Sequence, residues 1–125
     1  MELKAILPKG KVFSTVNAQM ITHELSNFGF ELQGKMSEYP PAPAGSKYVR
    51  TGFLGMSWNK SGPATVGNSI MVAVGNIMEY APLVQDEERQ KSFHKAHGWK
   101  TIQVVGKELW EGKYKPRIRQ ILRMK

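Results

Sequence analysis

The sequence predicts a single α+β domain. Three observations indicate this class: a helix-spaced apolar stripe in residues 14–32, a strand-rich middle in residues 53–75, and a second helical pattern from residue 102 onward. The chain has 125 residues, which is the usual size of one domain, so we assign residues 1–125 to one unit. A chain of this length buries enough apolar surface to fold without a disulfide or a metal ion.

The first helix is expected over residues 14–32. Ser14 or Thr15 can cap it, because a hydroxyl oxygen at that position accepts a hydrogen bond from a backbone N–H of the first turn. Its apolar residues recur at helical spacing and form one stripe: Val16, Met20, Leu25, Phe28 and Leu32.

The middle of the chain is expected to form an antiparallel meander. Residues 53–59 and 69–75 have the composition of strands, and the second of these is the richer in Ile, Val and Met. A turn is expected at residues 61–63, which read Ser-Gly-Pro, and another strand can begin at residues 65–66.

Two further segments are expected to be helical. Residues 78–84 can form a short turn or helix across the sheet edge, because Pro82 suits a first helical turn better than a central strand. Thr101 can cap a last helix over residues 102–113, and Pro116 either interrupts that helix or starts a new one. The apolar residues expected to continue the core stripe there are Val105, Leu109, Trp110, Ile118, Ile121 and Leu122.

A proline-rich arm is expected at residues 39–47, where three prolines fall within four positions. Such a composition excludes helix and favours a stiff, extended segment. An exposed segment of this type is suited to contacting a partner, and a plain connecting loop is the alternative interpretation. The candidate interface residues in and beside the arm are Tyr39, Pro40, Pro41, Pro43, Tyr48 and Arg50.

The net charge of +8 is unevenly distributed. Residues 1–88 carry seven Lys/Arg against eight Asp/Glu, whereas residues 89–125 carry eleven against two. This asymmetry indicates either an anionic partner, nucleic acid or an acidic protein surface, or only a solvated helix face. Nucleic-acid binding would be to phosphates and unspecific in sequence. The candidate contacts are Lys113, Lys115, Arg117, Arg119 and Arg123.

Signatures of catalysis are not found in the sequence. It has no glycine-rich phosphate loop, no nucleophile elbow and no cysteine. His94 and His97 can meet on one helical turn as part of a zinc site, but two exposed histidines are the plainer interpretation. A small basic RNase could combine Arg50, His94 and Glu79, although nothing in their spacing requires it. We therefore expect a non-enzymatic, intracellular protein without a cofactor, a metal ion, a secretory signal or a membrane span.

Three sequence blocks, in order, carry a resemblance to a known family. They are YVRTGFLGMSW at residues 48–58, preceded by the proline-rich arm, VGNIMEYAPLV at residues 74–84, and FHKAHGWKT at residues 93–101. Together they resemble small neck proteins of long-tailed bacteriophages, known as head–tail joining or tail-completion proteins, over roughly residues 13–124. The chain departs from the family pattern at Leu83, where an aromatic residue is common, and at residues 86–88, where a glycine-rich segment is common.

The resemblance implies both a fold and a role. The fold would be an N-terminal helix, a twisted antiparallel sheet with a long protruding loop, and a C-terminal helix packed on the sheet. The role would be a hexameric or dodecameric ring in the virion neck, between the portal or adaptor and the tail terminator or tube, made in the host cytoplasm and traversed by genome DNA. Residues matching the family motifs are Thr51, Gly52, Leu54, Ser57, Trp58, Gly75, Tyr80, Pro82 and Trp99. Trp58 is expected either in the core or against a neighbouring subunit.

Overall fold

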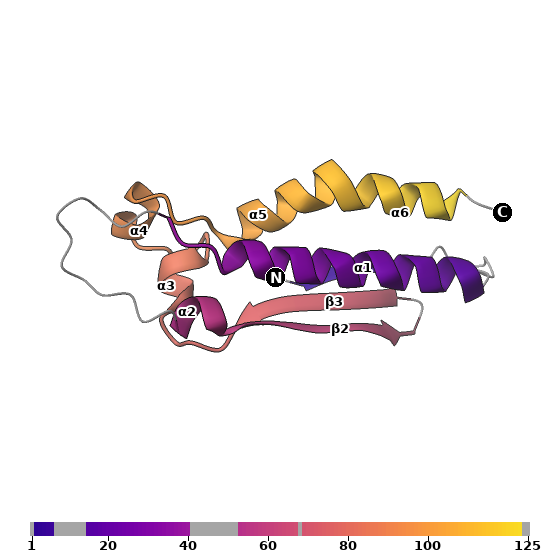
Figure 1. Ribbon diagram of the computed structural model, residues 1–125, viewed down its shortest axis with the longest axis horizontal. Coiled ribbons are helices and arrows are strands. Elements are labelled where there is room, and N and C mark those ends of the chain that lie inside the picture. The colour runs from indigo at the N-terminus through magenta and orange to yellow at the C-terminus, as the bar shows by residue number, and fades with distance from the viewer. Residues whose placement is uncertain (1, 7–14, 41–52, 68, 124–125) are drawn as a thin grey trace.

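The computed structural model describes residues 2–6, 15–40, 53–67 and 69–123. These residues form an α+β domain, as the sequence predicts. A three-stranded antiparallel sheet is one layer, a long helix is the middle layer, and the C-terminal helices are the third (Figure 1). A group of short helices lies at one end of the long axis, on the left in Figure 1.

Helix α1 (Thr15–Met36) is the longest element, with 22 residues. It extends four residues beyond the predicted end at Leu32. Its fully buried side chains recur every three or four positions, as expected for one helix face: Ile21, Leu25, Phe28, Leu32 and Met36. Gly29 is also buried, and a Cβ there would lie 2.6 Å from Cδ of Lys60 and 3.0 Å from Cγ2 of Val72. Helix α1 therefore lies close to the sheet at Gly29.

The sheet has the strand order β1-β3-β2. The central strand β3 (Ser69–Asn76) pairs antiparallel with β1 (Glu2–Ile6) on one side and with β2 (Trp58–Val66) on the other. On β3 the buried residues Ile70, Val72 and Val74 alternate with partly exposed ones. This period of two turns one face of the strand toward α1. The predicted strand at residues 69–75 is thus confirmed.

Strand β2 differs from the prediction, because it is continuous where a turn was expected. The pairing register with β3 shifts between Ser61 and Ala64, which is a β-bulge. Gly62 has a φ of +85° and Pro63 follows it. Glycine tolerates this φ, and proline has no N–H to donate to a ladder, so the two residues fit a bulge in an edge strand as well as they fit a turn. The expected turn at residues 61–63 is therefore wrong.

The start of the predicted first strand is also different. Residues Phe53–Met56 form a single helical turn, α2, and β2 begins only at Trp58. Asn76, at the end of β3, donates from its side-chain amide to the Leu54 carbonyl at 2.8 Å. This contact joins the short helix to the end of the sheet, a long-range pairing that the local sequence does not encode.

The C-terminal region forms one continuous helical rod of three parts. Helix α5 (Ile102–Leu109) is capped by Thr101, whose side chain accepts from the Val104 N–H as predicted. A π-helical turn, η1 (Trp110–Tyr114), leads into α6 (Lys115–Leu122), which has Pro116 in its first turn. Proline removes one α-helical hydrogen bond, and the wider π turn accommodates that loss, so the rod continues.

This rod packs mainly on α1, which separates it from much of the sheet (Figure 1). The resemblance implied a C-terminal helix on the sheet itself, and the packing partner is the detail that differs. The Phe28 ring meets the rings of Trp110 and Tyr114 edge-on, at centroid distances of 6.2 and 5.5 Å. Val105, Leu109, Ile118 and Ile121 are buried as predicted, whereas Leu122 is exposed.

A second, smaller core lies under the short helices. It buries Leu54 of α2 with Ala81 and Val84 of α3 (Ala81–Gln85). Pro82 stands in the first turn of α3, as predicted. Helix α4 (Ser92–Ala96) follows a turn and contacts α3.

Candidate functional site

The described residues that match the family motifs mostly hold the chain together. Trp58 is only 6% exposed and belongs to the main core, so it does not anchor a neighbouring subunit. Leu54 is buried in the second core, and Trp99 packs against it. Gly75 lies in β3 opposite Asn59. Thr51 and Gly52 lie outside the described residues.

The base of the proline-rich arm contacts its own chain. The Tyr39 hydroxyl accepts a hydrogen bond from the Gly55 N–H at 2.8 Å. The Tyr39 ring lies 5.1 Å from the Trp99 ring, centroid to centroid. Tyr39 therefore fixes the start of the arm to α2 and to the segment before α5. Of the other candidate interface residues, Pro40 is half-buried, and Pro41, Pro43, Tyr48 and Arg50 lie outside the described residues.

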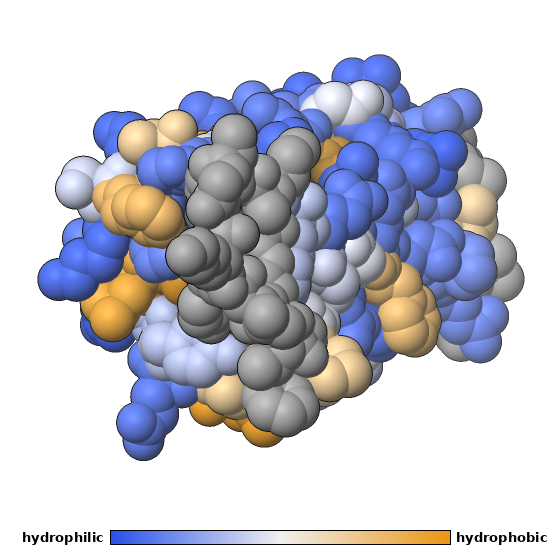
Figure 2. Space-filling model, turned by 60° about the vertical axis from the view of Figure 1, so that its left-hand side comes forward, coloured by the Kyte–Doolittle hydropathy of each residue, from blue (hydrophilic) through white to orange (hydrophobic). Residues whose placement is uncertain are grey.

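Large apolar side chains remain exposed around the short helices. Ile77, between β3 and α3, is 78% exposed, and Met56 of α2 is 71% exposed. Tyr80 and Leu83 are also exposed. Figure 2 turns this end of the molecule toward the viewer and shows apolar surface in several places, interrupted by polar side chains. We call the exposed side chains of Met56, Ile77, Tyr80 and Leu83 the apolar end.

Two of the five predicted anion contacts are instead paired with α1. Lys113 Nζ lies 2.8 Å from Oε1 of Glu31, and Arg117 lies 3.5 Å from Oε2 of Glu24. The buried Tyr114 hydroxyl donates to Glu31 at 2.7 Å. The hydrogen bond from Lys113, followed by that from Tyr114, lowers the pKa of Glu31 below its ordinary value. Burial and the Glu31 carboxylate raise the pKa of Tyr114, which keeps its proton.

The other three predicted contacts are not neutralised in this way. Among the described residues, no ion pair involves Lys115, Arg119 or Arg123. Arg119 and Arg123 are exposed, and Lys115 is half-buried. The basic surface of α6 is therefore smaller than the sequence indicates, and it lies at the opposite end of the long axis from the apolar end (Figure 1).

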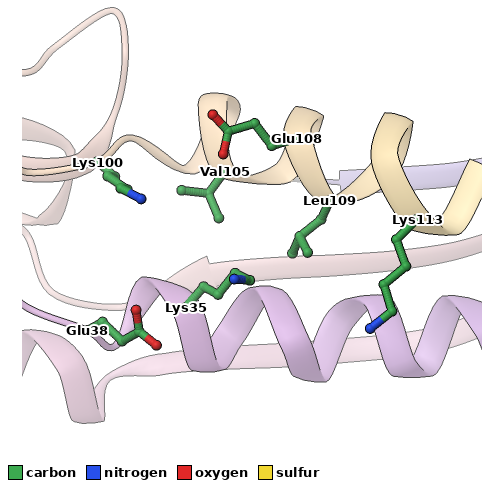
Figure 3. Close-up of a pocket in the computed structure, with 7 residues that line it drawn as sticks. All are labelled: Lys35, Glu38, Lys100, Val105, Glu108, Leu109 and Lys113. Carbon is green, nitrogen blue, oxygen red and sulfur yellow. The ribbon is translucent and has the colours of Figure 1, made fainter.

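A shallow groove of about 170 Å³ lies between the end of α1 and the start of the C-terminal rod (Figure 3). Its walls are three lysines, two glutamates and two apolar residues: Lys35, Glu38, Lys100, Val105, Glu108, Leu109 and Lys113. The lining mixes both signs of charge, so it favours neither an anionic nor a cationic ligand.

His94 and His97 lie among aromatic rings. The His97 ring stacks on Phe93 at 4.2 Å between centroids, and His94 meets Trp99 edge-on at 6.2 Å. Burial, and then the nearby His97, lowers the pKa of His94. Within the described ranges, no group of three or more His, Asp or Glu side chains is arranged to hold a metal ion.

The residues considered for an RNase are not brought together by the structure. Glu79 is exposed, and no hydrogen bond or ion pair in the described part of the chain joins it to His94. Arg50, the third residue considered, lies outside the described residues. The structure therefore gives no geometric support to the RNase hypothesis.

Sequence reasoning missed the side chain that positions α4. The Gln90 amide donates to the Val84 carbonyl at 2.7 Å and to the Trp99 carbonyl at 2.8 Å. A single glutamine in a charged stretch gives no sequence signal for these two hydrogen bonds. The cations and aromatic residues interleaved over positions 89–99 are a sequence signal for the surface of α4.

Comparison of the chain with protein-family models, with curated proteins and with solved structures finds no match. Among the helices of the described ranges, none combines the length and the apolar character that crossing a bilayer requires.

Proposed function

We propose that the protein is a structural, non-enzymatic component of the neck of a long-tailed bacteriophage, where copies assemble into a ring. The proposal is supported by a resemblance to this family in three sequence blocks, which occur in the family's order at residues 48–58, 74–84 and 93–101. In the proposed role the ring joins the portal or adaptor side of the capsid to the tail, and genome DNA passes through it.

The observation that carries the proposal is the apolar end. Several large exposed apolar side chains at one end of a small protein typically mark a protein contact. Ile77 and Met56 expose most of their side chains beside a well-packed second core, so this surface is fixed in place by folded structure. A closed ring needs two different surfaces on each subunit, and the apolar end and the α6 surface lie at opposite ends of the molecule (Figure 1).

Native mass spectrometry over a concentration series at moderate salt tests the proposal. We expect a single closed species of six or twelve chains, as the resemblance implies, that persists on dilution. Electron microscopy of that species should show a ring with a central opening. A protein that stays monomeric at every concentration, and that does not assemble when mixed with portal or tail proteins of its own phage, would contradict the proposal.

A second candidate function is non-specific nucleic-acid binding by the C-terminal region. The observation in its favour is that Lys115, Arg119 and Arg123 make no ion pair with a described carboxylate. Cations that meet phosphates release counterions, so the affinity would fall steeply with salt. This function predicts tight DNA binding by the isolated monomer that is lost when these three side chains are neutralised.

A further inference from the structure

The short helix α4 and the turn before it carry cations that are not neutralised. Arg89, Lys91 and Lys95 are all exposed. No carboxylate of the described residues forms an ion pair with any of them. These three cations lie within seven residues and follow three carboxylates at positions 86–88, so the attraction for a polyanion comes from the unpaired cations and not from a net positive charge of the segment.

The same helix carries an exposed aromatic ring. Phe93 is 60% exposed, although burial of an aromatic side chain is strongly favourable. The ring is supported from one side by His97, whose own ring lies 4.2 Å away at an interplanar angle of 31°. A flat ring that is backed by a second ring and open to solvent is the type of platform on which nucleic-acid bases stack.

Helical geometry places the lysines and the aromatic ring on two different faces of α4, with small residues between them on one side. Successive residues of an α-helix are about 100° apart, so positions four apart share a face. Lys91 and Lys95 are therefore on one face, and Phe93 and His97 are on another face about 160° around the helix from it. The small, exposed Ser92 and Ala96 lie between these two faces.

Several hydrogen bonds hold this surface in place. The two bonds from the Gln90 side chain tie the turn to α3 and to the segment before α5. The Lys91 N–H donates to the Leu83 carbonyl at 2.9 Å. At the other end, Gly98 has a φ of +84° and the Trp99 N–H returns to the His94 carbonyl at 3.1 Å, a typical helix stop. Preorganisation of this kind lowers the entropy cost of binding.

Of the three neighbouring acidic residues, Asp86 has its carboxylate bound to another segment, whereas Glu87 makes its contact through the backbone and its side chain is exposed. Asp86 accepts from the Gln103 side-chain amide at 3.4 Å, and the Glu87 N–H donates to the Gln103 side chain at 3.0 Å. Both contacts tie the start of the acidic turn to α5. Glu88 is the exposed carboxylate nearest to Arg89 in the chain, and no ion pair joins these two residues.

From this arrangement we propose that α4 is a nucleic-acid contact. Arg89, Lys91 and Lys95 would bind backbone phosphates, and Phe93 would stack on an unpaired base. The contact would be unspecific in sequence, because no base-edge donors or acceptors are required. It would prefer single strands or frayed ends over an intact duplex. The inference extends the proposed neck role without depending on it, since binding does not require a ring.

Two charge-matched triple variants of the full chain test the inference. One is Arg89→Gln, Lys91→Gln, Lys95→Gln on α4, and the other is Lys115→Gln, Arg119→Gln, Arg123→Gln on α6. Fluorescence anisotropy measures their binding to a single-stranded oligonucleotide of mixed sequence, and to its duplex, from low to physiological salt. Both variants lose three positive charges, so a general effect of net charge is the same in each.

We expect the α4 variant to bind the single strand about tenfold more weakly or worse, with the salt slope smaller by about 2, since each phosphate contact contributes about 0.7. The α6 variant should change affinity by less than about threefold. An equal or larger loss in the α6 variant, an unchanged α4 variant, or a wild-type chain that binds no DNA at low salt overturns the inference.

Phe93→Ala tests the stacking step separately. Single-strand affinity should fall about fivefold to a hundredfold, duplex affinity should stay within about twofold, and Phe93→Trp should restore single-strand binding. Equal losses for both DNA forms, or no rescue by tryptophan, overturn the stacking role. Native mass spectrometry of the same variants separates the two proposals. DNA binding by a chain that forms no ring, alone or mixed with portal or tail proteins, contradicts the neck role alone, whereas a ring without α4-dependent binding contradicts this inference alone.

Discussion

At the residue scale, two glycines of α1 differ in the space around them, because Gly29 is crowded and Gly34 is open. A Cβ on Gly29 would lie within 3.0 Å of Lys60 and at 3.0 Å from Val72 of the core, whereas Gly34 has no such neighbour within 4 Å. Alanine in place of a helical glycine gains about 1 kcal/mol. We expect Gly34→Ala to raise the free energy of unfolding by about 0.5–1 kcal/mol and Gly29→Ala to lower it by about 1 kcal/mol.

Urea denaturation of both variants measures this difference. The two substitutions are chemically identical and lie on the same helix, so each is the control for the other. A Gly29→Ala protein as stable as Gly34→Ala would show that the approach of α1 to the sheet is not constrained at this position.

Glu31 makes a stability contribution that depends on pH. Its pKa is lowered in the folded state, first by Lys113 and then by Tyr114. A lowered carboxyl pKa stabilises the fold above the unfolded pKa of about 4.5, and this stabilisation is lost as the pH falls through the lower folded value. We expect Glu31→Gln to flatten this part of the curve of unfolding free energy against pH, measured between pH 7 and pH 3.

Tyr114→Phe tests the second partner of the same carboxylate. It removes the hydroxyl that donates to Glu31 and keeps the ring on Phe28. We expect a loss of about 1.5 kcal/mol at pH 7 and a weaker acid dependence than in the wild type. A full wild-type acid dependence in Tyr114→Phe would show that Lys113 alone sets the Glu31 pKa.

At the element scale, Gln90 should control the local stability of α4. Its amide makes two hydrogen bonds to carbonyls that flank the helix. In Gln90→Ala we expect faster amide hydrogen exchange in residues 91–99 and unchanged protection in α1 and α5, because opening of α4 is local. Gln120→Ala, at an exposed position of α6, is the matched control. A uniform loss of protection across the domain would contradict a local role.

Elements with strong local signals were predictable, and those that depend on distant contacts were not. The apolar spacing of α1, the β-branched run of β3 and the Thr101 cap act within a few residues. The Gly62–Pro63 bulge has the same composition as a turn, and only the pairing with β3 distinguishes the two. In the candidate site, the sequence identified the cations of α6 but could not show that Glu31 and Glu24 neutralise two of them.

At the scale of the whole molecule, the apolar end should be required for assembly and not for folding. Met56 and Ile77 are largely exposed, so a charged residue at either position removes little core packing. We expect Met56→Glu, Ile77→Glu to shift the native mass from ring to monomer while the melting temperature of the monomer stays within about 2 °C of that of its control.

Thr65→Glu is that control, because Thr65 is exposed on β2 and lies outside the apolar end. It should retain the ring. A double glutamate variant that still assembles would place the subunit interface elsewhere on the molecule, and a variant that unfolds would show that these side chains serve the second core.

The irregularity of β2 has a consequence for how this protein avoids aggregation. An exposed edge strand presents unpaired backbone groups on which another chain can grow as a fibre. On β2, Pro63 offers no N–H, the bulge bends the strand, and Lys60 places its charged amine 2.6 Å from the Gly62 carbonyl. These features keep copies of this chain from adding to one another through this edge.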